Sequence, residues 1–203
     1  EIVENVKPDL IRNFYNDWYR PDLMAVIVVG DIDIEQTEKK IIQHFENIPA
    51  SKDPRARVEY EIPDNEEPLV SVASDKENTY TVIQMFIKHP NEDPTTVKAY
   101  RNSLMAQLYN GMINNRLNEI TQKPDAPFLY AGSSFGGFLG RTKSAYTLFT
   151  VPKENKINEA LEIIVAENEK VKRFGFTKSE LEREKKKLLV RYDQLAKEAD
   201  KTE

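Results

Sequence analysis

Apolar residues recur along this chain with two different spacings, which predict helices and strands in a definite order. Spacings of three and four predict helices over residues 8–20, 34–45, 94–122, 157–173 and 177 to the end. Continuous or alternating apolar stretches predict strands over residues 23–29, 69–73, 80–87, 128–135 and 144–151. The second and third of these strands are expected to form a hairpin. Residues 48–68 hold four prolines and predict an irregular connection, with a short strand at 58–62.

Local signals at the helix ends and the order of the elements predict the fold class. Pro8 suits the first turn of the first helix, and Thr177 with Glu180 suits a capping box on the last one. Strands joined by short turns favour an antiparallel sheet with helices covering one face, which is an α+β fold. We expect a single domain over residues 1–203, excised from a longer multi-domain chain, because the first residue is Glu1 and the helical pattern continues to the end.

Charge and composition exclude several classes of partner. The 34 acidic residues outnumber the 29 basic ones and the signs are interspersed, so no nucleic acid is expected as partner. The longest apolar run, residues 23–29, is far too short for a membrane span of about 20 residues. With no cysteine there is no disulfide or thiolate site. We expect a soluble protein, and the compartment stays open between the periplasm and the cytoplasm of a bacterium.

The candidates for chemistry do not assemble into a site. His44 and His89 have no further ligands at the spacing that a zinc site requires, and no partner residues for general-base catalysis. Exposed or capping roles are therefore favoured over ligation. The glycine-rich patch at residues 132–140 departs from a phosphate-binding loop and favours a bend or bulged hairpin. Serines 133, 134 and 144 have no nucleophile-elbow context. We therefore expect no catalytic residue and no bound metal or cofactor in this segment.

Several stretches of the chain resemble one peptidase family. Residues 14–24 read FYNDWYRPDLM and are followed by VVGD at residues 28–31; residues 114–120 and 124–130 and the start of the last helix resemble the same proteins. The chain is similar to the non-catalytic unit of the insulinase or pitrilysin-like zinc metallopeptidases, the inverzincins. The resemblance covers nearly the whole chain.

This resemblance implies a clam-shell peptidase built from related α+β units, similar to the repeats of mitochondrial processing peptidase. An upstream unit would supply the His-x-x-Glu-His zinc site, which is missing from these 203 residues. Thr121 stands where a later unit of such enzymes has an arginine, and the spacing to Tyr130 is altered. The resemblance therefore implies the unit that directly follows the zinc domain, with that domain and downstream repeats of the same polypeptide as partners.

Two functions remain open from the sequence, together with a third that we regard as less favoured. The chain is expected to be a non-catalytic domain of a zinc-dependent endopeptidase that packs on the zinc domain and helps enclose peptide substrates; alternatively, it belongs to a scaffold or binding protein descended from such peptidases. A stand-alone binding domain is the third. Residues 128–135 are a candidate edge strand for an extended peptide. Its candidate chamber-wall residues are Phe128, Tyr130, Ser133 and Phe135, although aromatic residues in strands more often belong to the core.

Overall fold

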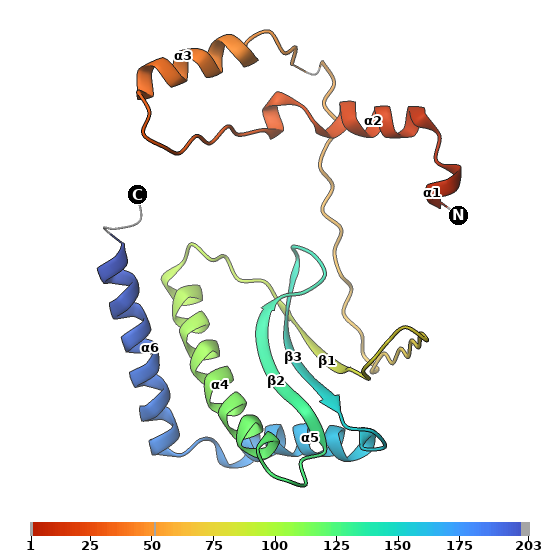
Figure 1. Cartoon of the computed structure of the whole chain (residues 1–203), viewed down its shortest axis with the longest axis vertical. Helices are drawn as coiled ribbons and strands as arrows, with labels where there is room; N and C mark the ends of the chain where they lie inside the picture. The colour runs from red at the N-terminus through yellow and green to blue at the C-terminus, as the bar shows by residue number, and fades with distance from the viewer. Residues whose placement is uncertain (1, 51, 200–203) are drawn as a thin grey trace. The chain divides into compact units, whose positions relative to one another are not determined.

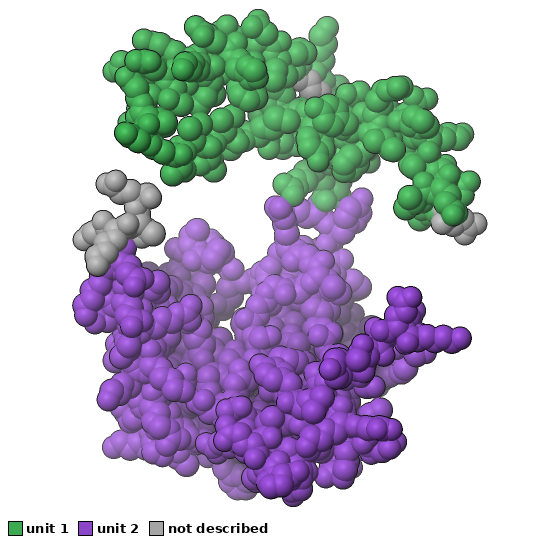
Figure 2. Space-filling view, in the orientation of Figure 1, with its two compact units in different colours: residues 1–58 green, residues 59–203 purple. Residues whose placement is uncertain are grey.

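The computed structural model describes residues 2–50 and 52–199 (Figure 1). The chain has two compact units, residues 1–58 and residues 59–203, which are coloured separately in Figure 2. The single domain expected over residues 1–203 stays a prediction. In the described part of the chain, no helix combines the length and the apolar composition that a bilayer span requires.

The first unit contains short helices joined by extended chain. Its elements are α1 (Ile2–Asn5), α2 (Pro8–Trp18), the 3-10 turn η1 (Pro21–Leu23) and α3 (Ile34–Phe45). Pro8 occupies the first turn of α2, where its missing N–H costs nothing. Asp33 caps α3 by accepting a hydrogen bond from the Gln36 N–H at 3.0 Å. These bounds confirm the two helices predicted over residues 8–20 and 34–45.

The strand predicted over residues 23–29 is wrong. The backbone at Met24 is extended, with φ −109° and ψ 151°, but residues 24–29 have no strand partner among the described residues. Their side chains are largely exposed, 84% for Ile27 and 81% for Val29. The apolar composition of this segment favours a strand, but a strand also requires the ladder hydrogen bonds of a neighbour.

The second unit is built around a three-stranded antiparallel sheet (Figure 1). Its elements are β1 (Ile83–Pro90), α4 (Val97–Thr121), β2 (Phe128–Gly137), β3 (Lys143–Pro152), α5 (Ile157–Phe174) and α6 (Lys178–Glu198). The strand order is β1-β3-β2, and both pairings are antiparallel. The predicted α+β class, the long helix, the last two strands and the last two helices are confirmed. The strand predicted over residues 80–87 corresponds to β1. The strands predicted at 58–62 and 69–73 are wrong, since among the described residues they have no strand partner, and the hairpin expected between 69–73 and 80–87 is wrong with them.

Helices cover one face of this sheet and form the core with it. Leu148 of β3 is 3% exposed and belongs to a cluster with Ile113 and Leu117 of α4 and with Ala160 and Ile164 of α5. Burying such side chains contributes about 1.5–3 kcal/mol each. Since residues of a strand alternate between its two faces, the β3 side chains on either side of Leu148 point to the opposite face.

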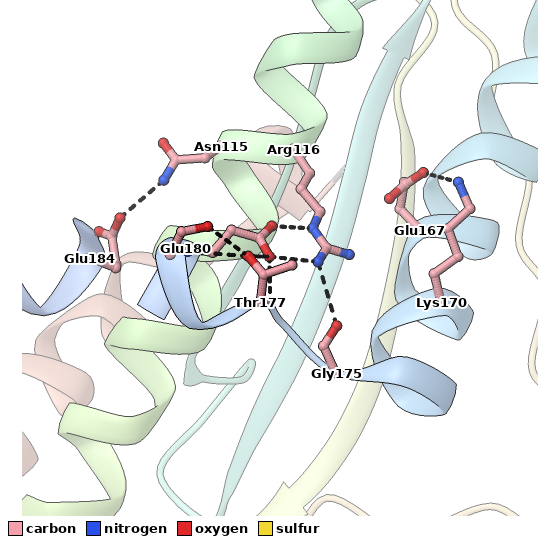
Figure 3. A network of polar contacts seen from close by, with 9 residues as sticks. Asn115, Arg116, Glu167, Lys170, Gly175, Thr177, Glu180 and Glu184 are labelled. Carbon is pink, nitrogen blue, oxygen red and sulfur yellow. Dashed lines mark hydrogen bonds and ion pairs between the residues drawn. The ribbon is translucent and has the colours of Figure 1, made fainter. Parts of the chain in front are cut away.

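An ion pair ties the start of α6 to α4, as Figure 3 shows. The predicted capping box is confirmed, because Thr177 Oγ1 accepts from the Glu180 N–H and the Glu180 carboxylate accepts from the Thr177 N–H. The same carboxylate accepts two hydrogen bonds from Arg116, from Nε at 2.5 Å and from Nη2 at 2.9 Å. Together these bonds lower the pKa of Glu180 to about 2, the Arg116 bond being the largest cause and partial burial opposing it. Gly175, with φ 70°, ends α5 just before this cap.

Candidate functional site

The histidines do not come together with other metal ligands. His44 lies in α3, where its ring contacts Phe45 with centroids 5.1 Å apart, and His89 lies in β1, 5.6 Å from the ring of Phe135. Among the described residues, no three His, Asp or Glu side chains are placed so that they could hold a metal ion. A zinc site needs three or four converging donors, so the described residues do not fit a zinc ion.

The four candidate wall residues of β2 divide between the interior and the surface. Phe128 is fully buried and is part of the core, as the alternative interpretation of the aromatic residues expected. Ser133 is 5% exposed and donates from Oγ to Asn110 Oδ1 of α4 at 2.8 Å. Tyr130 and Phe135 are 56% and 45% exposed. The prediction that β2 lines a chamber wall therefore depends on Tyr130 and Phe135.

The outer edge of β2 is partly closed by a side chain of α4. Asn114 accepts from the Ser133 N–H at 2.7 Å and donates to the Ser133 carbonyl at 3.0 Å. The two bonds match those that a neighbouring strand would make at this position, and β2 is an edge strand. An extended peptide cannot pair with the backbone of Ser133 unless it displaces Asn114, so the middle of the candidate edge strand is occupied.

Sequence reasoning missed Asn110 and Asn114. The helix predicted over residues 94–122 was interpreted through its apolar positions, and the polar residues between them were left without a role. Asn110 and Asn114 lie four residues apart, on the same face of α4, and beside the buried Met112 and Ile113. Asparagines repeated at helical spacing next to core residues are the signal that could have indicated a polar contact with the sheet.

The face of the sheet opposite the helices carries three aromatic rings, of which Tyr130 and Phe86 are exposed and Phe149 is half-buried. The ring of Phe149 in β3 contacts that of Tyr130, with centroids 5.4 Å apart, and it covers Gly132 so closely that a Cβ there would lie 2.9 Å from the ring. The ring of Phe86 in β1 contacts that of Phe138, with centroids 5.1 Å apart. We call Tyr130, Phe86 and Phe149 the open-face aromatics.

One end of this face is bordered by an ion pair and a hydrogen bond. Lys143 of β3 donates to both carboxylate oxygens of Asp64, at 2.9 and 2.8 Å, and lowers the pKa of Asp64. Lys88 of β1 donates to the carbonyl of Pro63. Residues 63 and 64 thus lie along the end of the sheet that carries Lys143 and Lys88, whereas Tyr130 pairs with Val151 towards the opposite end of β3.

A cavity of about 330 Å³ lies at the other side of β2, between that strand, α4 and α6. Its lining combines hydroxyl, amide and charged groups with an aromatic ring: Gln107, Asn110, Ser134, Phe135, Glu184, Lys187 and Arg191. The open-face aromatics and this cavity are thus two exposed surfaces in the described part of the chain.

Comparison with known proteins agrees with a domain that has no catalytic site. Residues 5–188 match the sequence model of a family described as the peptidase M16 inactive domain. The chain belongs to this family. An M16 inactive domain is a non-catalytic domain of a peptidase, which confirms the family resemblance inferred from residues 14–24 and 28–31.

Two curated relatives of this M16 inactive domain are much longer than the domain itself. It is 25% identical over 191 residues to a probable zinc protease PqqL of Haemophilus influenzae, covering 93% of this chain and 20% of the relative. It is 30% identical over 129 residues to a zinc protease PQQL-like protein of Arabidopsis thaliana, covering 63% of this chain and 14% of the relative. The chain therefore spans a fifth or less of the length of these relatives.

A solved structure supports the fold of the M16 inactive domain. The periplasmic protease PqqL from Escherichia coli matches 98% of this chain with a TM-score of 0.80 and 21% sequence identity, over 22% of that protein. At this identity the match shows the fold alone.

Proposed function

We propose that this chain is the non-catalytic domain of a zinc-dependent endopeptidase, where it packs on the zinc domain and helps to enclose the peptide substrate. The observation that carries the proposal is the match of residues 5–188 to the peptidase M16 inactive domain. Relatives called zinc proteases support the activity of the parent protein. Zinc would be bound by the upstream domain, because the described residues of this chain do not fit it.

The open-face aromatics are the surface that we assign to the substrate. Tyr130 is more than half exposed and Phe86 nearly half, and both lie on the side of the sheet that the core helices do not cover. Aromatic side chains provide a large contact area at a low cost in conformational entropy. An unfolded peptide that contacts Tyr130 and Phe86 buries apolar surface from both partners, which favours its retention in the chamber.

Kinetics of the whole parent protein test this role. Tyr130→Asp and Phe86→Asp are introduced in the full-length protein, and cleavage of a quenched fluorescent peptide is followed. We expect KM to rise several-fold with kcat nearly unchanged, because the change removes binding far from the bond that is cut. Phe174→Asp is the control, since Phe174 is 82% exposed at the end of α5 and outside the sheet. Unchanged KM in both sheet variants would contradict the assignment.

A second experiment tests the larger proposal. The chain of 203 residues alone is expected to show no chelator-sensitive cleavage of unstructured peptides, while the parent protein with its upstream region cleaves them. If the isolated chain cleaves peptides and a chelator abolishes this cleavage, the proposal that the domain is non-catalytic is refuted. An intact zinc motif upstream together with an inert parent protein would favour the scaffold function instead. The Escherichia coli relative is called periplasmic, which favours the periplasm of the two compartments left open by the sequence.

A further inference from the structure

The exposed side of α6 carries a row of positive charges. Four basic residues lie along one side of the helix, because they are separated by three, one and four residues in the sequence: Arg183, Lys186, Lys187 and Arg191. Lys187 pairs with Glu184 at 3.1 Å. Within the described residues, Arg183, Lys186 and Arg191 have no carboxylate within ion-pair distance. We call these four residues the α6 basic row.

The α6 basic row continues into the cavity at the edge of β2. All four of its residues lie together on the exposed surface of α6, and Lys187 and Arg191 also line the cavity of about 330 Å³ between α4, β2 and α6. Because Lys187 and Arg191 belong to both, a ligand in the cavity can extend along the row without leaving the protein surface.

Donors without a partner remain in the cavity once its internal bonds are counted. Asn110 is occupied, since it accepts from Ser133 Oγ and donates to the Ala106 carbonyl at 2.9 Å. The side chain of Gln107, by contrast, has no hydrogen-bond partner within the described part of the chain. Its amide group is thus free to bind a ligand.

The one carboxylate in the cavity is neutralised. Glu184 accepts a hydrogen bond from Asn115 Nδ2 at 3.0 Å and also forms the ion pair with Lys187. The guanidinium of Arg191 is therefore the uncompensated charge at the cavity, and a guanidinium prefers a carboxylate that it can bind with two parallel hydrogen bonds. The exposed ring of Phe135 supplies an apolar wall beside it.

We propose that the cavity and the α6 basic row bind an acidic segment of the peptide substrate. This inference rests on the proposed function, since it names the class of peptide that the domain retains. One carboxylate binds Arg191 at the cavity, and an apolar neighbour of that residue contacts Phe135. A second carboxylate reaches Arg183, eight residues and about 12 Å away along the helix. An extended peptide covers that distance in about four residues, so the preferred peptides carry two carboxylates four residues apart.

Fluorescence anisotropy with labelled peptides tests the inference on the whole chain. One 12-residue peptide carries two glutamates four residues apart beside a leucine, and a matched peptide carries glutamines in their place. We expect the glutamate peptide to bind about ten-fold more tightly than the glutamine peptide, because two exposed ion pairs together contribute roughly that factor. The difference should shrink as salt is raised from low to high concentration.

Two double variants with the same net charge distinguish binding at the α6 basic row from the effect of the overall charge of the protein. Arg183→Gln with Arg191→Gln should abolish the preference for glutamate. Lys98→Gln with Lys178→Gln removes two exposed charges at the starts of α4 and α6 and should leave that preference unchanged. Equal loss in both double variants would overturn the inference. Equal binding of both peptides would overturn it too, while leaving the proposed contact of peptides with Tyr130 and Phe86 intact.

The remaining outcome concerns a different partner. If neither peptide binds, but the upstream domain of the parent binds the chain and Arg183→Gln with Arg191→Gln weakens that binding, the α6 basic row belongs to a contact between domains. That result would overturn the peptide site. It would leave the non-catalytic role in place, since this role is tested by cleavage in the parent protein.

Discussion

Replacing Glu180 by glutamine separates the ion pair with Arg116 from the cap that the same side chain places on α6. A glutamine can still accept from the Thr177 N–H, since capping boxes use either residue. Its amide nitrogen then lies where a carboxylate oxygen accepts from Arg116 Nε at 2.5 Å, so a donor faces a donor. The variant keeps the start of the helix and weakens its attachment to α4, because the ion pair and the bond from Arg116 Nε are lost while Nη2 can still donate to the remaining oxygen.

The magnitude follows from the pKa of Glu180. A shift from 4.5 in the unfolded chain to about 2 in the folded one corresponds to at most roughly 3 kcal/mol of stability above pH 4.5. The side chains of Arg116 and Glu180 remain 21% and 15% exposed, so solvent screens part of this and we expect about 1–2 kcal/mol. Because the folded pKa is depressed, the contribution is complete above pH 4.5 and is lost as the pH falls towards 2.

Denaturant unfolding of the whole chain at several pH values measures this. Glu180→Gln should lower the free energy of unfolding at pH 7, equivalent to a few degrees in Tm for a chain of this length, and the deficit should fall below half at pH 3. Thr177→Ala is the matched control, because it removes the hydroxyl that accepts from the Glu180 N–H at 3.3 Å and donates to the Glu180 carboxylate at 2.8 Å. It should cost about 1 kcal/mol, with a weaker dependence on pH than Glu180→Gln, because Arg116 is the largest cause of the lowered pKa of Glu180. A deficit of Glu180→Gln that is the same at pH 7 and pH 3 would refute the reasoning.

Three further substitutions test the contacts around β2 and α4. Asn114→Ala leaves the buried Ser133 N–H without its partner and should cost about 1–3 kcal/mol, seen as faster amide exchange at Ser133. Gly132→Ala places a Cβ 2.9 Å from the Phe149 ring and should cost about 1–3 kcal/mol; the cost should be smaller in a Phe149→Ala background, and equal costs would contradict the steric cause. Gly111→Leu must displace the Glu184 carboxylate, which lies 2.3 Å from the position of a Cβ. Thermal unfolding should therefore show a loss of about 1–3 kcal/mol, with a smaller loss when Glu184 is also changed to alanine.

The sequence predicted those elements whose local signals and partners agree. The last helix was predicted from its periodicity and from Thr177 with Glu180, and the structure forms the same cap. The strands over residues 128–135 and 144–151 are paired with each other in the structure, joined by a short connection. The strands expected at 23–29 and 69–73 failed for one physical reason. Apolar composition indicates that a segment can be a strand, but it does not identify the neighbour that must supply the hydrogen bonds.

The candidate site could be predicted only in part, because its residues come from elements far apart in the sequence. The absence of a His-x-x-Glu-His motif is visible in the sequence alone. The sequence alone does not show that Phe128 lies in the core and Tyr130 on the open face. The register of β2 shifts between residues 128 and 130, so strict alternation fails there. The basic residues of α6 looked like an ordinary solvated helix face, and their link to β2 became visible only in the structure.

The closure of β2 by Asn114 limits how a peptide can approach this domain. An edge strand with free backbone groups invites pairing with any extended chain, and Asn114 removes that possibility at Ser133 by making both bonds itself. A peptide that approaches the middle of β2 must therefore contact side chains: Tyr130 on the open face or Phe135 beside the cavity. Selection among peptides would then depend on side-chain chemistry more than on backbone shape, and the guanidinium of Arg191 beside Phe135 is where an acidic residue would be distinguished from a neutral one.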